Sequence, residues 1–131
     1  MVNINNKPWD KLRFRDIEKF LSESGDENFF FEFKSDDEEP KKLIKEISAF
    51  ANTYGGYILL GVNDDKTIGG CKKWTEQRIH ITIHDSITPI PNFDVKKFTS
   101  KGKHIFVIKI EGATPPYITN RGDIYERVSS G

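Results

Sequence analysis

The feature of this sequence that most constrains its fold is an apolar run at residues 57–62, which directly follows Gly55 and Gly56. A run that is apolar on both faces is typical of a strand inside a sheet, where both faces are covered. Residues 40–52 carry apolar side chains at helical spacing, and Pro40 suits the first turn of a helix. We expect this helix to end at the glycines, with a positive φ at one of them. The pattern therefore predicts a helix packed on a central strand.

The rest of the chain alternates between helical and extended patterns. Apolar side chains three or four residues apart predict further helices at residues 10–22 and 74–87. Alternating apolar and polar side chains predict strands at residues 29–34, 67–68, 93–99, 104–110 and 124–128. A chain of 131 residues, 36% of them hydrophobic, has the size and composition of one domain. We expect a single α/β (α+β) domain over residues 1–131, with helices packed on a mixed β-sheet.

Composition and charge narrow the functional classes. Twenty basic side chains balance twenty acidic ones, whereas the affinity of duplex-binding proteins comes largely from positive charge around phosphates. A tight, autonomous DNA-binding protein is disfavoured, and any nucleic-acid site must be a local patch. Cys71 is the only cysteine, so no internal disulfide can form, which indicates a cytoplasmic protein. The chain opens without a signal-peptide pattern and has no apolar run long enough to cross a bilayer, so we expect no membrane partner.

Acidic residues flank two of the predicted strands. Glu32 and Lys34 share one face of the first strand, where a carboxylate beside an ammonium group stays ionised. Glu27 has the opposite parity and can join them only from the preceding turn or across a bulge. Asp64 follows the central strand, at the end where α/β sheets usually keep functional groups. From spacing alone, two interpretations remain open: one shared acidic site, or an exposed ion pair and a separate turn aspartate.

Two other patterns are weaker. His80 and His84 are four residues apart, the spacing of a metal-binding pair on a helix, but no third ligand accompanies them. Gly55 and Gly56 stand between a helix and a strand, which is the reverse order of a phosphate-binding loop, and no Gly-Lys-Ser/Thr motif is present. We therefore expect no ATP hydrolysis by this chain.

The segments around the acidic residues resemble one family closely. The segments that match are Glu32–Lys34, Ile47–Tyr57, Gly61–Asp65 and Ile124–Val128, and they are similar to the Schlafen AlbA_2 domain. The resemblance covers roughly residues 15–131. It implies a DNA-binding domain of bacterial and archaeal transcriptional regulators, and it implies that this chain is the N-terminal part of a longer protein.

In animal Schlafens this domain is similar to a metal-dependent RNA endonuclease with three carboxylates. Carried onto this sequence, the resemblance places the catalytic and metal-binding carboxylates at Glu27, Glu32 and Asp64, with Lys34 in support and Mg²⁺ or Mn²⁺ as the metal. Asn63 departs from the acidic residue that the family has at that position. Those nucleases use a duplicated domain with basic flanks, whereas this chain has one copy and no net charge.

Basic side chains that could contact phosphates occur in several segments. They are Lys34, Lys41, Lys42, Lys45, Lys72, Lys73, Arg78, Arg121 and Arg127, and the aromatic side chains that could stack on bases are Tyr54, Trp74 and Tyr117. The leading hypothesis is a regulatory domain that binds nucleic acid, DNA or RNA, weakly. The alternatives are a metal-dependent ribonuclease and a protein-interaction domain, for instance in a homodimer, with a vestigial acidic site.

Overall fold

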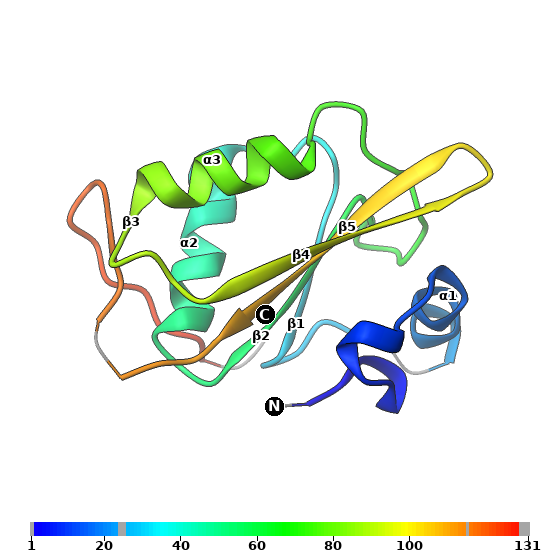
Figure 1. The fold of residues 1–131 in the computed structure, drawn as a ribbon, viewed down its shortest axis with the longest axis horizontal. Helices are drawn as coiled ribbons and strands as arrows, with labels where there is room; N and C mark the ends of the chain where they lie inside the picture. The colour runs from blue at the N-terminus through cyan, green and yellow to red at the C-terminus, as the bar shows by residue number, and fades with distance from the viewer. Residues whose placement is uncertain (1, 24–25, 115, 129–131) are drawn as a thin grey trace.

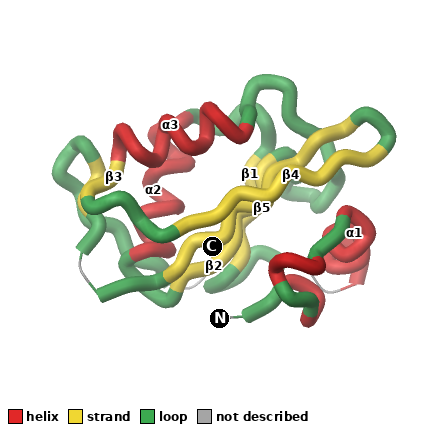
Figure 2. The backbone as a smooth tube through the Cα atoms, viewed as in Figure 1, coloured by secondary structure: helices red, strands yellow, loops and turns green. Residues whose placement is uncertain are grey.

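The computed structural model describes residues 2–23, 26–114 and 116–128 (Figure 1). A mixed sheet forms the middle of the molecule, as Figure 2 shows. In spatial order its strands are β1 (Phe31–Lys34), β2 (Gly55–Leu60), β5 (Lys103–Glu111) and β4 (Phe93–Ser100). β1 and β2 are parallel, and the other two pairs are antiparallel. The predicted central strand is an inner strand, and the mixed α/β class is confirmed.

Helices cover both faces of this sheet. α2 (Pro40–Ala51) and α3 (Glu76–Ser86) cover one face, and α1 (Phe14–Glu23) with the short 3-10 turns Ile4–Asn6 and Trp9–Lys11 covers the other (Figure 1). Because side chains alternate along a strand, Ile58 and Leu60 pack in the core under α2 and α3. Tyr57 and Leu59 pack in the core under α1. No helix in the described ranges is long and apolar enough to span a membrane.

The first two residues of β2 are glycines, and both are needed for close packing. Gly55 has a φ of +75°, which confirms the expected positive φ. Gly56 needs no unusual torsion, but a Cβ there would lie 2.3 Å from the ring of Phe50 on α2. A side chain at Gly56 would therefore force α2 and β2 apart, whereas a Cβ at Gly55 would lie 2.4 Å from the carbonyl oxygen of Ile110 on the neighbouring strand β5.

Several element boundaries differ from the sequence-based expectation. The first helix begins at Phe14, after a 3-10 turn and Leu12, and the first strand begins at Phe31. Phe29 and Phe30 form a turn, closed by a 3.1 Å hydrogen bond from the amide of Asn28 to the carbonyl of Phe31. The expected strand at residues 67–68 is a single bridge between Val62 and Ile68.

The predicted last strand at residues 124–128 is wrong. Only Ile124 pairs there, in one bridge to Ile118. A small second sheet was not predicted: β3 (Ile87–Thr88) pairs with β6 (Ile118–Thr119). The alternation of residues 124–128 does not reflect a buried face, because Ile124 and Val128 are 54% and 74% exposed. Side-chain contacts hold this segment instead.

Candidate functional site

The acidic residues of the first strand lie against α2. Glu32 and Lys34 stand opposite Ile58 and Leu60 in the parallel register, so they face the same side of the sheet as α2. The Nζ atom of Lys34 lies 3.7 Å from Oε1 of Glu32 and 3.2 Å from Oε2 of Glu38, just before α2. We call Glu27, Glu32, Lys34, Glu38 and Glu46 the acidic edge, because β1 is an outer strand.

A tight turn brings Glu27 to the acidic edge. The chain reverses at Phe29 and Phe30, so the segment before the turn runs back along β1. Oε1 of Glu27 accepts a 2.9 Å hydrogen bond from the amide of Phe33, next to Glu32. The parity that separates Glu27 from Glu32 in a regular strand is thus overcome by the preceding turn, one of the two routes open from the sequence.

Arg127 fills the space between the strand and the helix. Its Nη1 atom donates to Oε2 of Glu32 at 3.0 Å and to Oε2 of Glu46 at 2.8 Å. Its Nη2 and Nε atoms donate to the carbonyls of Asn28 and Phe29, and the guanidinium lies 4.4 Å from the ring centroid of Phe50. Only 9% of this side chain is exposed. Arg127 therefore has little capacity left for a phosphate.

The charges at the acidic edge compensate one another incompletely. Burial, then repulsion from Glu46 and Glu27, raise the pKa of Glu32, although Arg127 and Lys34 oppose the shift. Burial alone would lower the pKa of Lys34, but attraction to Glu38, Glu46 and Glu32 outweighs it and raises that pKa. Lys34 therefore stays charged at neutral pH as a partner of two carboxylates.

Asp64 lies beside this cluster rather than in it. It is exposed, and it lines a hollow of about 310 Å³ with Lys34, Glu38 and Asn63. An ion pair of 2.5 Å between Asp26 and Lys66 ties the segment before β1 to the turn that carries Asp64.

The expected metal ligands do not fit a divalent cation in this arrangement. The Phe33 amide holds an oxygen of Glu27, and Arg127 and Lys34 hold Glu32. Across residues 2–23, 26–114 and 116–128, no three His, Cys, Asp or Glu side chains are placed to hold a metal ion. The structure thus brings Glu27, Glu32 and Lys34 together, with Asp64 on the neighbouring hollow.

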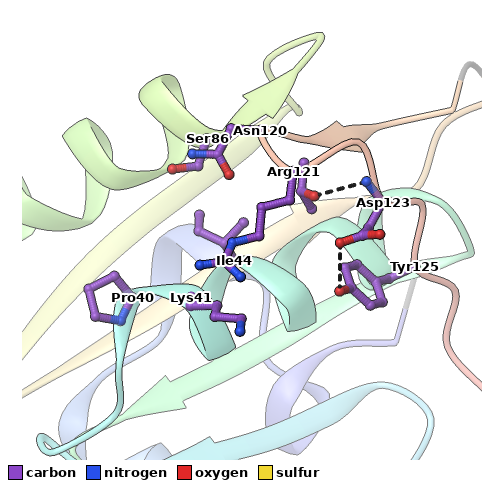
Figure 3. Close-up of a pocket in the computed structure, with 9 residues that line it drawn as sticks. Pro40, Lys41, Ile44, Ser86, Asn120, Arg121, Asp123 and Tyr125 are labelled. Atoms are coloured by element: carbon purple, nitrogen blue, oxygen red, sulfur yellow. Dashed lines mark hydrogen bonds between the residues drawn. The ribbon is translucent and has the colours of Figure 1, made fainter.

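A second hollow gathers basic side chains. It has a volume of about 200 Å³ and lies between the start of α2, the end of α3 and the turn after β6 (Figure 3). Its lining residues are Pro40, Lys41, Ile44, Ser86, Thr119, Asn120, Arg121, Asp123 and Tyr125. Figure 3 shows Arg121 reaching from the turn toward Lys41 on α2. Lys45 borders this hollow, with its Nζ atom 5.4 Å from the ring centroid of Tyr125. We call it the cationic hollow.

Basic side chains also gather at the loop before α3 and at the start of that helix, namely Lys72, Lys73 and Arg78. Nζ of Lys73 pairs with Asp37 at 2.8 Å, and Arg78 stacks on Trp74 with its guanidinium 4.0 Å from the ring centroid. The carboxylate of Asp36 accepts hydrogen bonds from the amides of residues 72–74. Burial would raise the pKa of Asp36, but these backbone hydrogen bonds lower it. Lys72 is exposed, and the carboxylates that contact this loop are those of Asp36 and Asp37.

The three aromatic side chains proposed for base stacking differ in exposure. Trp74 is only 1% exposed and Tyr117 only 6%, so stacking on bases by these two is wrong. Trp74 packs inside because its Nε1 donates to the carbonyl of Glu38 at 3.1 Å, which closes the polar end of an otherwise apolar ring. Tyr54 is 74% exposed and remains accessible.

Two residues that organise the C-terminal segment were not singled out from the sequence. The amide side chain of Asn52, at the end of α2, accepts from the amide of Tyr117 at 2.6 Å and donates to the carbonyls of Tyr117 and Tyr125 at 2.9 Å. Glu46 pairs with Arg127. Their signal in the sequence is weak, because a polar residue on a helix is usually solvated.

Comparison with known proteins identifies the family. The family model for Schlafen, AlbA_2 matches residues 27–131. This chain belongs to the Schlafen AlbA_2 family. The match begins at Glu27, the first residue of the acidic edge, so α1 lies before the matched part of this Schlafen AlbA_2 chain.

Two solved structures share the fold. The DIP2311 protein from Corynebacterium diphtheriae has a TM-score of 0.63 and 21% identity over 86% of this chain, which spans 24% of the length of that protein. The N-terminal domain of an ATP-dependent DNA helicase RecG-related protein from Nitrosomonas europaea has a TM-score of 0.61 and 21% identity. That match covers 88% of this chain and 90% of the domain. At this identity the likeness concerns the fold.

Proposed function

We propose that this Schlafen AlbA_2 domain is a nucleic-acid-binding module of a regulatory protein, and that the cationic hollow contacts the phosphate backbone. The observation that carries the proposal is the convergence of Lys41 and Arg121 on one hollow. Both are exposed, and within the described part of the chain neither forms an ion pair. Cations without a carboxylate partner are available to replace the counterions of a phosphate.

The other groups of the hollow suit a sugar–phosphate chain. The hydroxyl of Ser86 and the side chain of Asn120 can donate to phosphate or sugar oxygens, as polar side chains commonly do in such interfaces. The hydroxyl of Tyr125 donates to Oδ2 of Asp123 at 3.3 Å. The other oxygen of this carboxylate can accept a hydrogen bond from a sugar hydroxyl. A structural neighbour is the N-terminal domain of a protein named as DNA helicase RecG-related, and the family resemblance implies DNA binding.

The affinity of the isolated domain should be weak, since the basic and acidic side chains balance at twenty each. We expect a Kd in the micromolar range or weaker, with a strong dependence on salt. Fluorescence anisotropy with labelled single-stranded RNA, single-stranded DNA and duplex DNA, at about 50 and about 200 mM NaCl, measures both properties.

Paired substitutions locate the site. Lys41→Ala with Arg121→Ala should weaken binding by about tenfold at low salt and flatten the salt dependence, because two phosphate contacts are lost. The matched control is Arg15→Ala with Lys19→Ala, which removes the same charges from the exposed side of α1 on the other face of the sheet. Equal losses in both double variants, or no binding of any probe by the wild type, would contradict the proposal. RNA cleavage in Mg²⁺ that Asp64→Ala abolishes would instead assign a nuclease role to Asp64 and the neighbouring acidic edge.

A further inference from the structure

The acidic edge contains a pocket that matches the shape and charge of a guanidinium group. We infer that this pocket is a guanidinium-binding site, that Arg127 is its resident ligand, and that this contact holds the C-terminal segment in the position that completes the cationic hollow. The last part rests on the proposed function, because it concerns the same hollow. The first two parts rest only on contacts within the chain.

Each wall of the pocket contacts a different part of the guanidinium. The carboxylates of Glu32 on β1 and Glu46 on α2 share Nη1, at 3.0 and 2.8 Å. The Phe29–Phe30 turn directs the carbonyls of residues 28 and 29 at Nη2 and Nε, at 2.6 and 3.4 Å. Phe50 lies one helical turn after Glu46 on α2, and its ring stacks on the face of the cation.

This set of partners selects a guanidinium over other cations. A guanidinium is planar, presents its N–H donors as a fork, and stacks on aromatic rings. An ammonium group is a compact point charge that cannot reach both carboxylates, both carbonyls and the ring at once. A divalent metal prefers a shell of oxygen ligands, and one face of this pocket is the ring of Phe50. The carboxylates therefore have an internal counter-ion of a different chemical class from a metal.

The contact also positions the segment that follows β6. Arg121, Asp123 and Tyr125 line the cationic hollow, and they lie between two side-chain anchors. Asn52 binds the backbone at Tyr117 and Tyr125, and Arg127 is the second anchor. Backbone hydrogen bonds hold the turn at residues 119–123, but residues 124–128 form only one bridge. Release of Arg127 would free the end of the segment and displace one wall of the hollow.

Loss of Arg127 would leave an excess of negative charge at the pocket. Glu32, Glu46 and Glu27 would then face one another, with Lys34 as the nearby cation. A vacated pocket of this kind should accept a free guanidinium compound from solution. It should discriminate against an ammonium compound of similar size, for the reasons of shape given above.

Chemical rescue tests the inference. R127A should melt below the wild type, and millimolar ethylguanidinium chloride should restore several degrees of its melting temperature. The same salt should have no such effect on the wild type, whose pocket is filled, or on R121A, the matched loss of an arginine from the same segment. Ethylammonium chloride should not rescue R127A. Equal melting of R127A and wild type would overturn the inference, as would rescue by MgCl₂ or MnCl₂ that equals or exceeds rescue by ethylguanidinium.

A second measurement uses the wild type and stands if R127A does not fold. Trypsin must draw an arginine side chain into its own pocket, so it should cleave after exposed Arg121 well before it cleaves after Arg127, which is 9% exposed. Early release of the 1–127 fragment from the folded protein would overturn the inference. Neither readout involves nucleic acid, so failure of the proposed function would leave both results standing.

The link to the hollow is tested separately: R127A should bind RNA or DNA more weakly, and ethylguanidinium should restore that binding.

Discussion

The acidic edge and the cationic hollow both lie between α2 and a neighbouring segment of the chain. The cations at the acidic edge are paired with carboxylates, whereas those at the cationic hollow are exposed and unpaired among the described residues. At the acidic edge, Arg127 and Lys34 are mostly buried and each contacts two carboxylates. At the cationic hollow, Lys41 and Arg121 are exposed and line an open space. A list of basic residues does not separate these two groups. A neutral chain can therefore still present a local positive surface, because some of its other cations are paired with carboxylates inside the fold.

The comparison assigns different roles to the two groups of cations. Removing one partner from a buried charge pair leaves an uncompensated charge, which lowers the free energy of unfolding. Removing an exposed, unpaired cation usually changes stability little. Stability should therefore respond to substitutions at the acidic edge, and nucleic-acid affinity should respond to substitutions at the cationic hollow.

The largest expected effect separates two lysines seven positions apart. Lys34→Met removes the cation between Glu32 and Glu38, and we expect a loss of about 1–3 kcal/mol in the free energy of unfolding. Lys41→Met should change it by no more than about 0.5 kcal/mol. Urea unfolding of both variants at neutral pH measures the difference. Equal stability losses would mean that Lys34 and Lys41 do not differ in their structural roles.

A smaller effect concerns the ionisation of Glu32. Its pKa is raised in the folded protein, so the folded state binds this proton more tightly than the unfolded chain does. The ionised side chain then subtracts from stability as pH rises from the ordinary carboxyl pKa through the raised one. We expect Glu32→Gln to melt at or above the wild-type temperature at neutral pH, because the amide keeps an oxygen for Arg127 and removes repulsion from Glu46 and Glu27.

The stability of the Glu32→Gln variant relative to the wild type should also depend on pH. The advantage of Glu32→Gln should shrink as pH falls to the ordinary carboxyl pKa, where wild-type Glu32 is protonated in the folded state. Melting temperatures of the two proteins across this range provide the test. A variant that melts well below the wild type at neutral pH would mean that attraction to Arg127 and Lys34 outweighs burial and repulsion.

Local physics makes the centre of the fold predictable from the sequence. The amphipathic pattern of α2, the apolar run of β2 and the two glycines that begin β2 each constrain one short segment. Periodicity fails for residues 124–128, because an alternating pattern does not report whether a partner strand exists. It also fails for Trp74, whose burial depends on the carbonyl of Glu38 from a distant turn.

The candidate site is predictable only in part, for a related reason. Resemblance to the family places Glu27 and Glu32 in one site, and the turn at Phe29 and Phe30 brings them together. The pairing of Arg127 with Glu32 and Glu46 spans 95 and 81 residues. No spacing rule reports such a contact, since it arises when a C-terminal segment crosses α2 and meets β1. Which cations remain free for a ligand is therefore a property of the folded chain.

Binding of nucleic acid at the cationic hollow can be tested by titrating the ¹⁵N-labelled domain with a short oligonucleotide at low salt and following amide chemical shifts. We expect the largest shifts on the walls of the cationic hollow, at Lys41, Lys45 and residues 119–123. Amides of the loop before α3, at Lys72 and Lys73, should shift little, because both already donate to Asp36 and the side chain of Lys73 pairs with Asp37. Largest shifts at Lys72 and Lys73, with none at Lys41 and Arg121, would contradict the account.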